Sequence, residues 1–136
     1  MGEWPSRGRG GPLAKRLSLD AKELALKIAN AALDKQALTI EIIDVGTKVD
    51  YTSFVVICSG RSERQVDAIA SAVEGLLKKE QIYALGVEGR EANQWVLMDY
   101  GDVVVHIFED HMRGFYDLEG LWIDAQRVPL RAASGV

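Results

Sequence analysis

Two histidines and several carboxylates are the side chains of this 136-residue sequence that could do catalytic chemistry. His106 could act as a general base if Asp99 held its imidazole ring in place, because a carboxylate commonly orients a catalytic histidine. In the strand pairing predicted below, Asp99 lies opposite Val104, so only a diagonal contact with His106 is available. Two other interpretations of His106 are more usual. It lies at the surface or in an interface, or it lies in the core with its hydrogen bonds satisfied, and the sequence does not decide between them.

The acidic residues raise a second possibility, which is magnesium-assisted phosphoryl transfer by a nucleotidyltransferase-like enzyme acting on nucleotides. That chemistry needs two or three carboxylates that converge closely. No alternate-position pair such as Asp-x-Asp lies on a predicted strand, and the two histidines have no cysteine near them at zinc-ligand spacing. The sequence therefore predicts no metal, no cofactor and no catalysis, but solvated or partner-facing acids at Asp44, Asp50, Glu88, Asp99 and Asp102.

A predicted hairpin must position His106 and Asp99. Gly101 and Asp102 lie between two apolar runs, and glycine adopts a positive φ without steric cost, so this pair predicts a two-residue loop. One face of the resulting hairpin is apolar apart from a tyrosyl hydroxyl, and we expect it to be core; its pairs are Tyr100–Val103, Met98–Val105 and Val96–Ile107. The other face has the pairs Asp99–Val104, Leu97–His106 and Trp95–Phe108.

Trp95 lies on this mixed face beside Asp99. A tryptophan in such a strand is either covered by a helix or exposed as an anchor for a partner, and tryptophan is over-represented among interface hot spots. Its spacing in the sequence does not decide between the two.

The remaining elements predict an α/β domain, a two-layer or sandwich-like arrangement with a five-stranded mixed sheet. Ser62 is a plausible N-cap of the longest predicted helix, which joins strands two and three in parallel, and the last hairpin is antiparallel. The predicted helices cover residues 20–34, 63–80 and 110–121, and the strands before the hairpin cover Thr39–Val45, Phe54–Ser59 and Tyr83–Val87.

Composition indicates a single domain at residues 18–124, after a disordered basic leader at residues 1–17 and before a flexible tail at residues 125–136. The single cysteine, Cys58, lies in an apolar run and excludes an intramolecular disulfide, which is typical of a reducing compartment. No run of apolar residues is long enough for a membrane helix or a secretion signal, so we expect a soluble intracellular protein.

Charge is distributed unevenly along the chain. Residues 18–126 hold ten basic and nineteen acidic residues, a net charge of −9, whereas both ends are basic. Such an acidic domain repels the phosphate backbone of nucleic acids and favours a basic protein partner.

Four spaced motifs resemble those of the ribosomal silencing factor family, RsfS, which is also called Iojap. They are LGVEG at Leu85–Gly89, WVLMD at Trp95–Asp99, GDVVVHIF at Gly101–Phe108, and R-x-x-Y-x-L-E-x-L-W at Arg113–Trp122. The resemblance extends from about Leu24 to Trp122 and includes Asp50, Phe54, Gly60 and Ser62.

The resemblance implies a non-enzymatic protein of nucleotidyltransferase-like topology that binds the large ribosomal subunit. Family members dock on ribosomal protein uL fourteen and block joining of the small subunit, which represses translation. The implied location is the cytoplasm of a bacterial-type cell rather than an organelle matrix. Apart from the resemblance, the sequence leaves open a homodimer that buries the Trp95 face when the protein is off the ribosome. Its charge distribution allows at most contacts of the basic tail with ribosomal RNA, and we expect no membrane contact. The implied docking residues are Leu85, Gly86, Glu88, Trp95, Asp99, Asp102 and His106.

Overall fold

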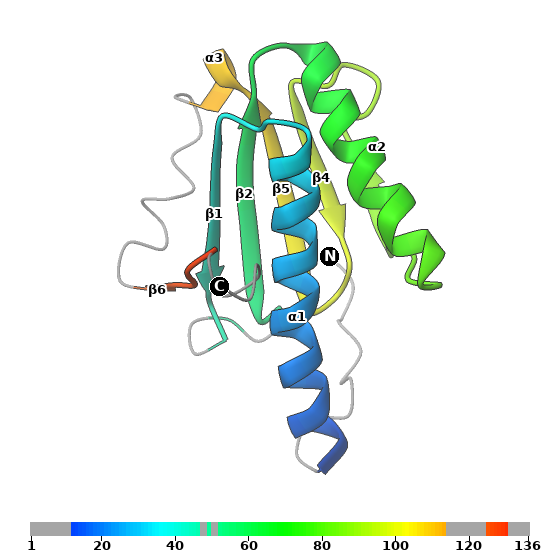
Figure 1. Cartoon of the computed structure of the whole chain (residues 1–136), viewed down its shortest axis with the longest axis vertical. Coiled ribbons are helices and arrows are strands. Elements are labelled where there is room, and N and C mark those ends of the chain that lie inside the picture. Colours follow the sequence, from blue (N-terminus) through cyan, green and yellow to red (C-terminus); the bar gives the residue numbers. More distant parts are fainter. Residues whose placement is uncertain (1–11, 47–48, 50–51, 114–124, 131–136) are drawn as a thin grey trace.

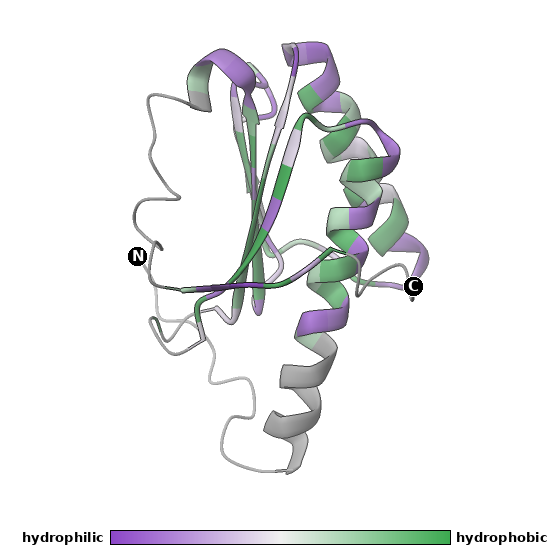
Figure 2. Cartoon of the chain, turned by 60° about the vertical axis from the view of Figure 1, so that its left-hand side comes forward, coloured by the Kyte–Doolittle hydropathy of each residue, from purple (hydrophilic) through white to green (hydrophobic). Residues whose placement is uncertain are grey.

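The computed structural model describes residues 12–46, 49, 52–113 and 125–130. Helices α1 and α2 lie side by side across one face of a sheet (Figure 1), and a view turned by 60° shows both on the same side of it (Figure 2). The elements follow in the order α1 (Pro12–Asp34), β1 (Thr39–Asp44), β2 (Phe54–Gly60), α2 (Glu63–Lys79), β3 (Gly86–Glu88), β4 (Trp95–Asp99), β5 (Val103–Glu109), α3 (Asp110–Arg113) and β6 (Gln126–Arg127).

The sheet is mixed, as predicted. Its six strands in the described residues have the order β3-β4-β5-β2-β1-β6, in which only β2 and β5 pair in parallel. The predicted number of five strands is wrong, because Gln126 and Arg127 pair with Asp44 and Ile43 at one edge. α2 connects two strands that run in the same direction, β2 and β3, but β5 and β4 lie between them.

The predicted hairpin register is confirmed. Trp95 pairs with Phe108, Leu97 with His106 and Asp99 with Val104. The loop is closed by a hydrogen bond of 2.9 Å from the Tyr100 amide to the Val103 carbonyl, and Gly101 has a φ of 88°. Glycine is favoured at this first loop position because an L side chain rarely adopts a positive φ.

The main core lies between the sheet and the two helices. It contains the predicted apolar face of the hairpin, together with the inner sides of α1 and α2. β2 is buried along its whole length, since it lies at the centre of the sheet and carries apolar side chains on both faces. The hairpin residues in this core are Val96, Met98, Tyr100, Val103, Val105 and Ile107.

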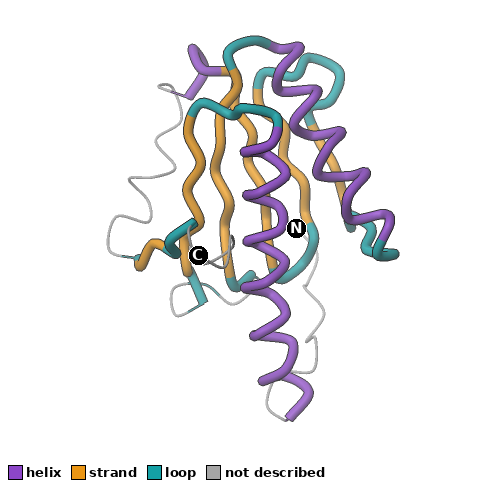
Figure 3. Tube along the Cα trace, in the orientation of Figure 1, coloured by secondary structure: helices purple, strands orange, loops and turns teal. Residues whose placement is uncertain are grey.

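The two helices differ in how well their ends were predicted. α2 begins at Glu63, and the Ser62 hydroxyl caps it by accepting a hydrogen bond of 3.1 Å from the Gln65 amide. α1 begins at Pro12 rather than near Asp20, so it is longer than α2 and includes part of the predicted leader. Proline suits the first position of a helix, and the Leu, Ala, Lys and Arg residues that follow are good helix formers. α1 ends, and α2 begins, at the same end of the sheet (Figure 3).

Three other boundaries differ from the prediction or are only partly described. β3 occupies Gly86–Glu88 instead of Tyr83–Val87, because pairing with β4 begins only where Gly86 meets Asp99. β6 lies within the predicted flexible tail. The last predicted helix begins as α3, and its continuation, like the leader up to residue 11 and the tail from residue 131, lies outside the described residues.

Candidate functional site

The face of the sheet that is turned away from α1 and α2, here called the second face, carries the candidate site. Successive side chains of a strand point to opposite faces, so the residues that alternate with the main core gather there. A separate apolar cluster lies on this face, and Trp95 packs against it. The register aligns side chains across the strands in rows, of which one is Glu88, Leu97, His106, Ile57 and Glu41.

Trp95, His106 and Phe108 form an aromatic group on the second face. The Trp95 and Phe108 rings are stacked with centroids 5.1 Å apart, and the Trp95 indole Nε1 donates a hydrogen bond of 3.1 Å to His106 Nδ1. Phe108 is fully buried, whereas Trp95 and His106 are half-buried. The indole is therefore supported by protein on one side and still reaches the surface.

His106 is neutral in this arrangement. Burial lowers its pKa from 6.5 to about 4, because a charged imidazole is poorly solvated inside the protein. Since Nδ1 accepts the indole hydrogen bond, the ring proton is on Nε2. His106 thus supports Trp95, and Asp99 lies opposite Val104 as the sequence predicted.

Asp99 and Asp102 shape the hairpin loop. An oxygen of the Asp99 carboxylate accepts a hydrogen bond of 2.8 Å from the Gly101 amide. The Asp102 carbonyl accepts hydrogen bonds from the amides of Ser53 and Phe54, at 2.9 and 3.0 Å. Both acids are half-buried, so their charges lie at the rim of the second face without being removed from water.

Leu85, Gly86 and Glu88 lie along the edge strand β3 and the residue before it. Leu85 is 60% exposed, and its amide donates a hydrogen bond of 2.7 Å to the Asp99 carbonyl. A Cβ added at Gly86 would meet no atom within 4 Å in the part of the chain that the structure describes, and Glu88 is exposed. The structure therefore places the residues predicted to dock a partner along one edge of the sheet and on the adjoining second face.

The connection between β3 and β4 fixes the position of Trp95, and sequence reasoning did not single it out. Gly89 has a φ of 91°, and a Cβ there would lie 2.1 Å from the Trp95 carbonyl oxygen. Asn93 also has a positive φ, of 57°, and its amide donates to the Gly89 carbonyl at 2.9 Å. The glycine at the end of the LGVEG motif was the available signal.

Arg90 ties this connection to α2. Its guanidinium forms ion pairs with Asp67 at 2.9 Å and Glu74 at 3.4 Å, and donates to the Ser71 hydroxyl at 3.0 Å. The edge of the sheet that carries Glu88 and Trp95 is thereby held against the helical layer.

Within residues 12–46, 49, 52–113 and 125–130, no three His, Cys, Asp or Glu side chains gather in a way that could hold a metal ion. Asp50 lies outside this part of the chain, and Cys58 is buried. None of the described helices is long and apolar enough to cross a membrane.

Comparison with known proteins identifies close relatives. A family described as "Ribosomal silencing factor during starvation" matches residues 18–135. The ribosomal silencing factor RsfS of Bacillus subtilis is 42% identical over 101 residues, which cover 74% of this chain and 86% of that protein. The corresponding protein of Zymomonas mobilis is 37% identical over 111 residues, covering 82% of this chain and 84% of that protein. A crystal structure of a Chromobacterium violaceum protein superimposes with a TM-score of 0.70 at 33% identity, covering 82% and 89% of the two chains.

Proposed function

The chain belongs to the ribosomal silencing factor family, RsfS, and we propose that it binds the large ribosomal subunit through ribosomal protein uL fourteen and sterically blocks joining of the small subunit. Translation is repressed as a result. This action needs neither a cofactor nor a catalytic step, because a folded body placed between the subunits obstructs their contact by its volume.

The observation that carries the proposal is the half-buried indole of Trp95, supported by His106 and Phe108. Interfaces take most of their binding energy from a few aromatic or arginine anchors that lose contact with water on binding. An indole whose orientation is fixed beforehand loses little conformational entropy when it docks. Trp95 is therefore the proposed anchor.

Charge supports a basic partner. Glu88, Asp99 and Asp102 lie on the second face and its edge, the face that also carries Trp95, and residues 18–126 carry a net charge of −9. Complementary charges mainly accelerate association and select the partner, whereas desolvated apolar contacts supply the affinity. The proposed division of roles is steering by these acids and anchoring by Trp95.

Gly86 supports a close approach of the partner to the edge strand. Gly86 is the first residue of β3, and a glycine in a strand often marks a position where another backbone comes close. Gly86 pairs with Asp99, and no described residue lies within 4 Å of the position that a Cβ would take there. With Leu85 beside it, this edge extends the proposed docking surface beyond Trp95.

Further parts of the proposal concern the free protein. We place the protein in the cytoplasm of a bacterial-type cell. When no ribosome is bound, it forms a homodimer that buries Trp95. On the ribosome, its contacts with ribosomal RNA are limited to the basic tail. The nucleotidyltransferase-like topology stays a prediction. Sizing of the free protein by light scattering tests the dimer.

A subunit-joining assay tests the proposed function. Purified large subunits are incubated with the protein, small subunits are added, and the joined ribosomes are quantified on a sucrose gradient. We expect the protein to co-sediment with the large subunit and to reduce joining as its concentration rises. If the subunits join normally while saturating protein co-sediments with the large subunit, the steric mechanism is ruled out. If the protein does not co-sediment with the large subunit, the proposed binding is ruled out.

A further inference from the structure

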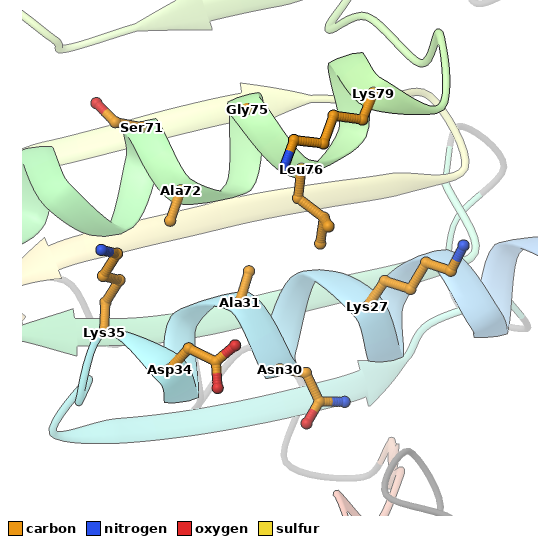
Figure 4. Close-up of a pocket in the computed structure, with 10 residues that line it drawn as sticks. All are labelled: Lys27, Asn30, Ala31, Asp34, Lys35, Ser71, Ala72, Gly75, Leu76 and Lys79. Atoms are coloured by element: carbon orange, nitrogen blue, oxygen red, sulfur yellow. The ribbon is translucent and has the colours of Figure 1, made fainter.

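A groove lies between α1 and α2 on the outer side of the helical layer, with a volume of about 560 Å³ (Figure 4). The two helices are antiparallel. Near one end of the groove, Gln65 at the start of α2 donates hydrogen bonds to the carbonyls of Lys35 and Gln36. At the other end, Lys27 forms an ion pair of 2.6 Å with Glu80. The groove is therefore held open between helices that are fixed at both ends.

Gly75 lies in this groove and is not explained by the fold of the chain. It lies within α2, is exposed, and does not have a positive φ. A Cβ at this position would meet no atom of the described residues within 4 Å. Glycine inside a helix is less stable than alanine, so neither backbone conformation nor packing within the described residues favours it. Close approach of a partner gives a reason for a glycine here.

The surroundings of Gly75 indicate the chemistry of that partner. Alanine and leucine side chains of both helices line the groove near the glycine, namely Ala31, Ala72 and Leu76. The amine of Lys35 is turned toward Ala72 and that of Lys79 toward Leu76 (Figure 4). Within the described part of the chain, neither amine has a carboxylate partner, and Asp34 is the acid among the lining residues.

We propose that this groove docks an acidic amphipathic helix of a second protein, whose backbone passes close to Gly75. An apolar stripe on that helix would cover the alanines, and carboxylates on either side of the stripe would meet Lys35 and Lys79. An RNA backbone matches the amines but offers nothing apolar to the groove. Because the sheet separates the groove from Trp95, this partner and the ribosome can be bound together, and the inference does not rest on the proposed function.

The first test concerns the glycine itself. Gly75→Ala in the full chain should raise the melting temperature, because alanine stabilises a helix and its methyl group has room. A lower melting temperature would show that the fold requires this glycine, and would overturn the inference.

The second test identifies the occupant. Photoreactive p-benzoylphenylalanine in place of Asp34, an exposed lining residue, is activated in cells that express the full chain, and the crosslinked peptides are sequenced by mass spectrometry. We expect one helical segment with an excess of acidic residues. A crosslink to RNA, a crosslink to a second copy of this chain, or no crosslink would overturn the proposal.

Variants make this result specific to the groove. We expect at least a tenfold weaker crosslink in Gly75→Leu, whose new side chain has space in the isolated chain but fills the groove. We expect the same reduction in the double variant Lys35→Glu/Lys79→Glu. The matched control Lys22→Glu/Lys78→Glu changes two exposed lysines that do not line the groove, and should leave the crosslink intact. A crosslink that persists in Gly75→Leu would overturn the proposal. Gly75→Leu should still co-sediment with large subunits, which separates this inference from the proposed function.

Discussion

The indole nitrogen of Trp95 donates a hydrogen bond of 3.1 Å to Nδ1 of His106. The two residues lie on neighbouring strands, and the pairing of Trp95 with Phe108 places His106 two residues away along β5. The hydrogen bond requires a neutral imidazole with an unprotonated Nδ1. His106 therefore connects the protonation state of the site with the orientation of its aromatic anchor.

Acidification should destabilise the fold through His106. Because its folded pKa is about 4 and the ordinary value is 6.5, the unfolded chain takes up the proton first as the pH falls. The contribution of the neutral His106 to the free energy of unfolding is fully present above pH 6.5 and is lost progressively as the pH falls from 6.5 to 4. Urea unfolding at pH 7.5, 6, 5 and 4.5 should show a shallower loss of stability for His106→Gln, which keeps an acceptor but does not titrate. Equal losses in both proteins would contradict this role. The exposed His111–Glu109 pair is the same in both, so it cancels in the comparison.

Gly89→Ala should destabilise the protein by about 1–3 kcal/mol, through a positive φ in a residue with a Cβ and a clash with the Trp95 carbonyl oxygen. Gly86→Ala is the matched control, since it adds the same methyl group where nothing lies within 4 Å. Chemical unfolding should place Gly86→Ala within about 0.5 kcal/mol of wild type. Equal effects of the two substitutions would show that Gly89 does not have a special conformation.

Arg90→Gln should loosen the β3–β4 connection more than it lowers global stability. Its ion pairs with Asp67 and Glu74 are partly exposed, so their loss should cost about 1 kcal/mol or less. Hydrogen exchange should nevertheless become faster at the Asn93 amide, which donates to Gly89 in this connection. The control Lys27→Gln removes an exposed ion pair elsewhere and should leave that amide unchanged.

Removing acidic charge from the second face and its edge strand should slow association with large subunits. Asp99→Asn keeps an oxygen that can accept the Gly101 amide, so it tests the charge without opening the loop. Glu88→Lys reverses an exposed charge on the edge strand. Both variants should associate several-fold more slowly at low salt and should show a weaker salt dependence than wild type. Glu23→Lys, an exposed acid on α1, is the control. Salt-independent association of the wild type would argue against electrostatic steering.

The hairpin was predictable from local sequence because its loop residues and apolar alternation agree. Shifting the register by one residue would have turned Val96, Met98 and Val105 away from the helices, so the apolar pattern fixes the pairing. β6 has no such pattern: it consists of Gln126 and Arg127, both exposed, and only its pairing with β1 reveals it.

The site was predictable in its residues but not in its interactions. Strand alternation places Trp95 and His106 on one face, but the hydrogen bond between them depends on side-chain rotamers, which the pattern does not contain. The link from Arg90 to α2 joins residues sixteen and twenty-three positions apart, and no local signal marks such a contact. Gly89 was part of a recognised motif, but the reason for a glycine became apparent only from its distance to the Trp95 carbonyl.

The affinity of Trp95→Ala for purified large subunits tests the central claim most directly. We expect a loss of about 2 kcal/mol or more, which corresponds to roughly thirtyfold weaker binding. Leu33→Ala, which truncates a 52% exposed side chain on α1, should bind like wild type. Both variants should keep the wild-type circular dichroism spectrum. Unchanged affinity of a folded Trp95→Ala protein would contradict the assignment of Trp95 as the docking anchor.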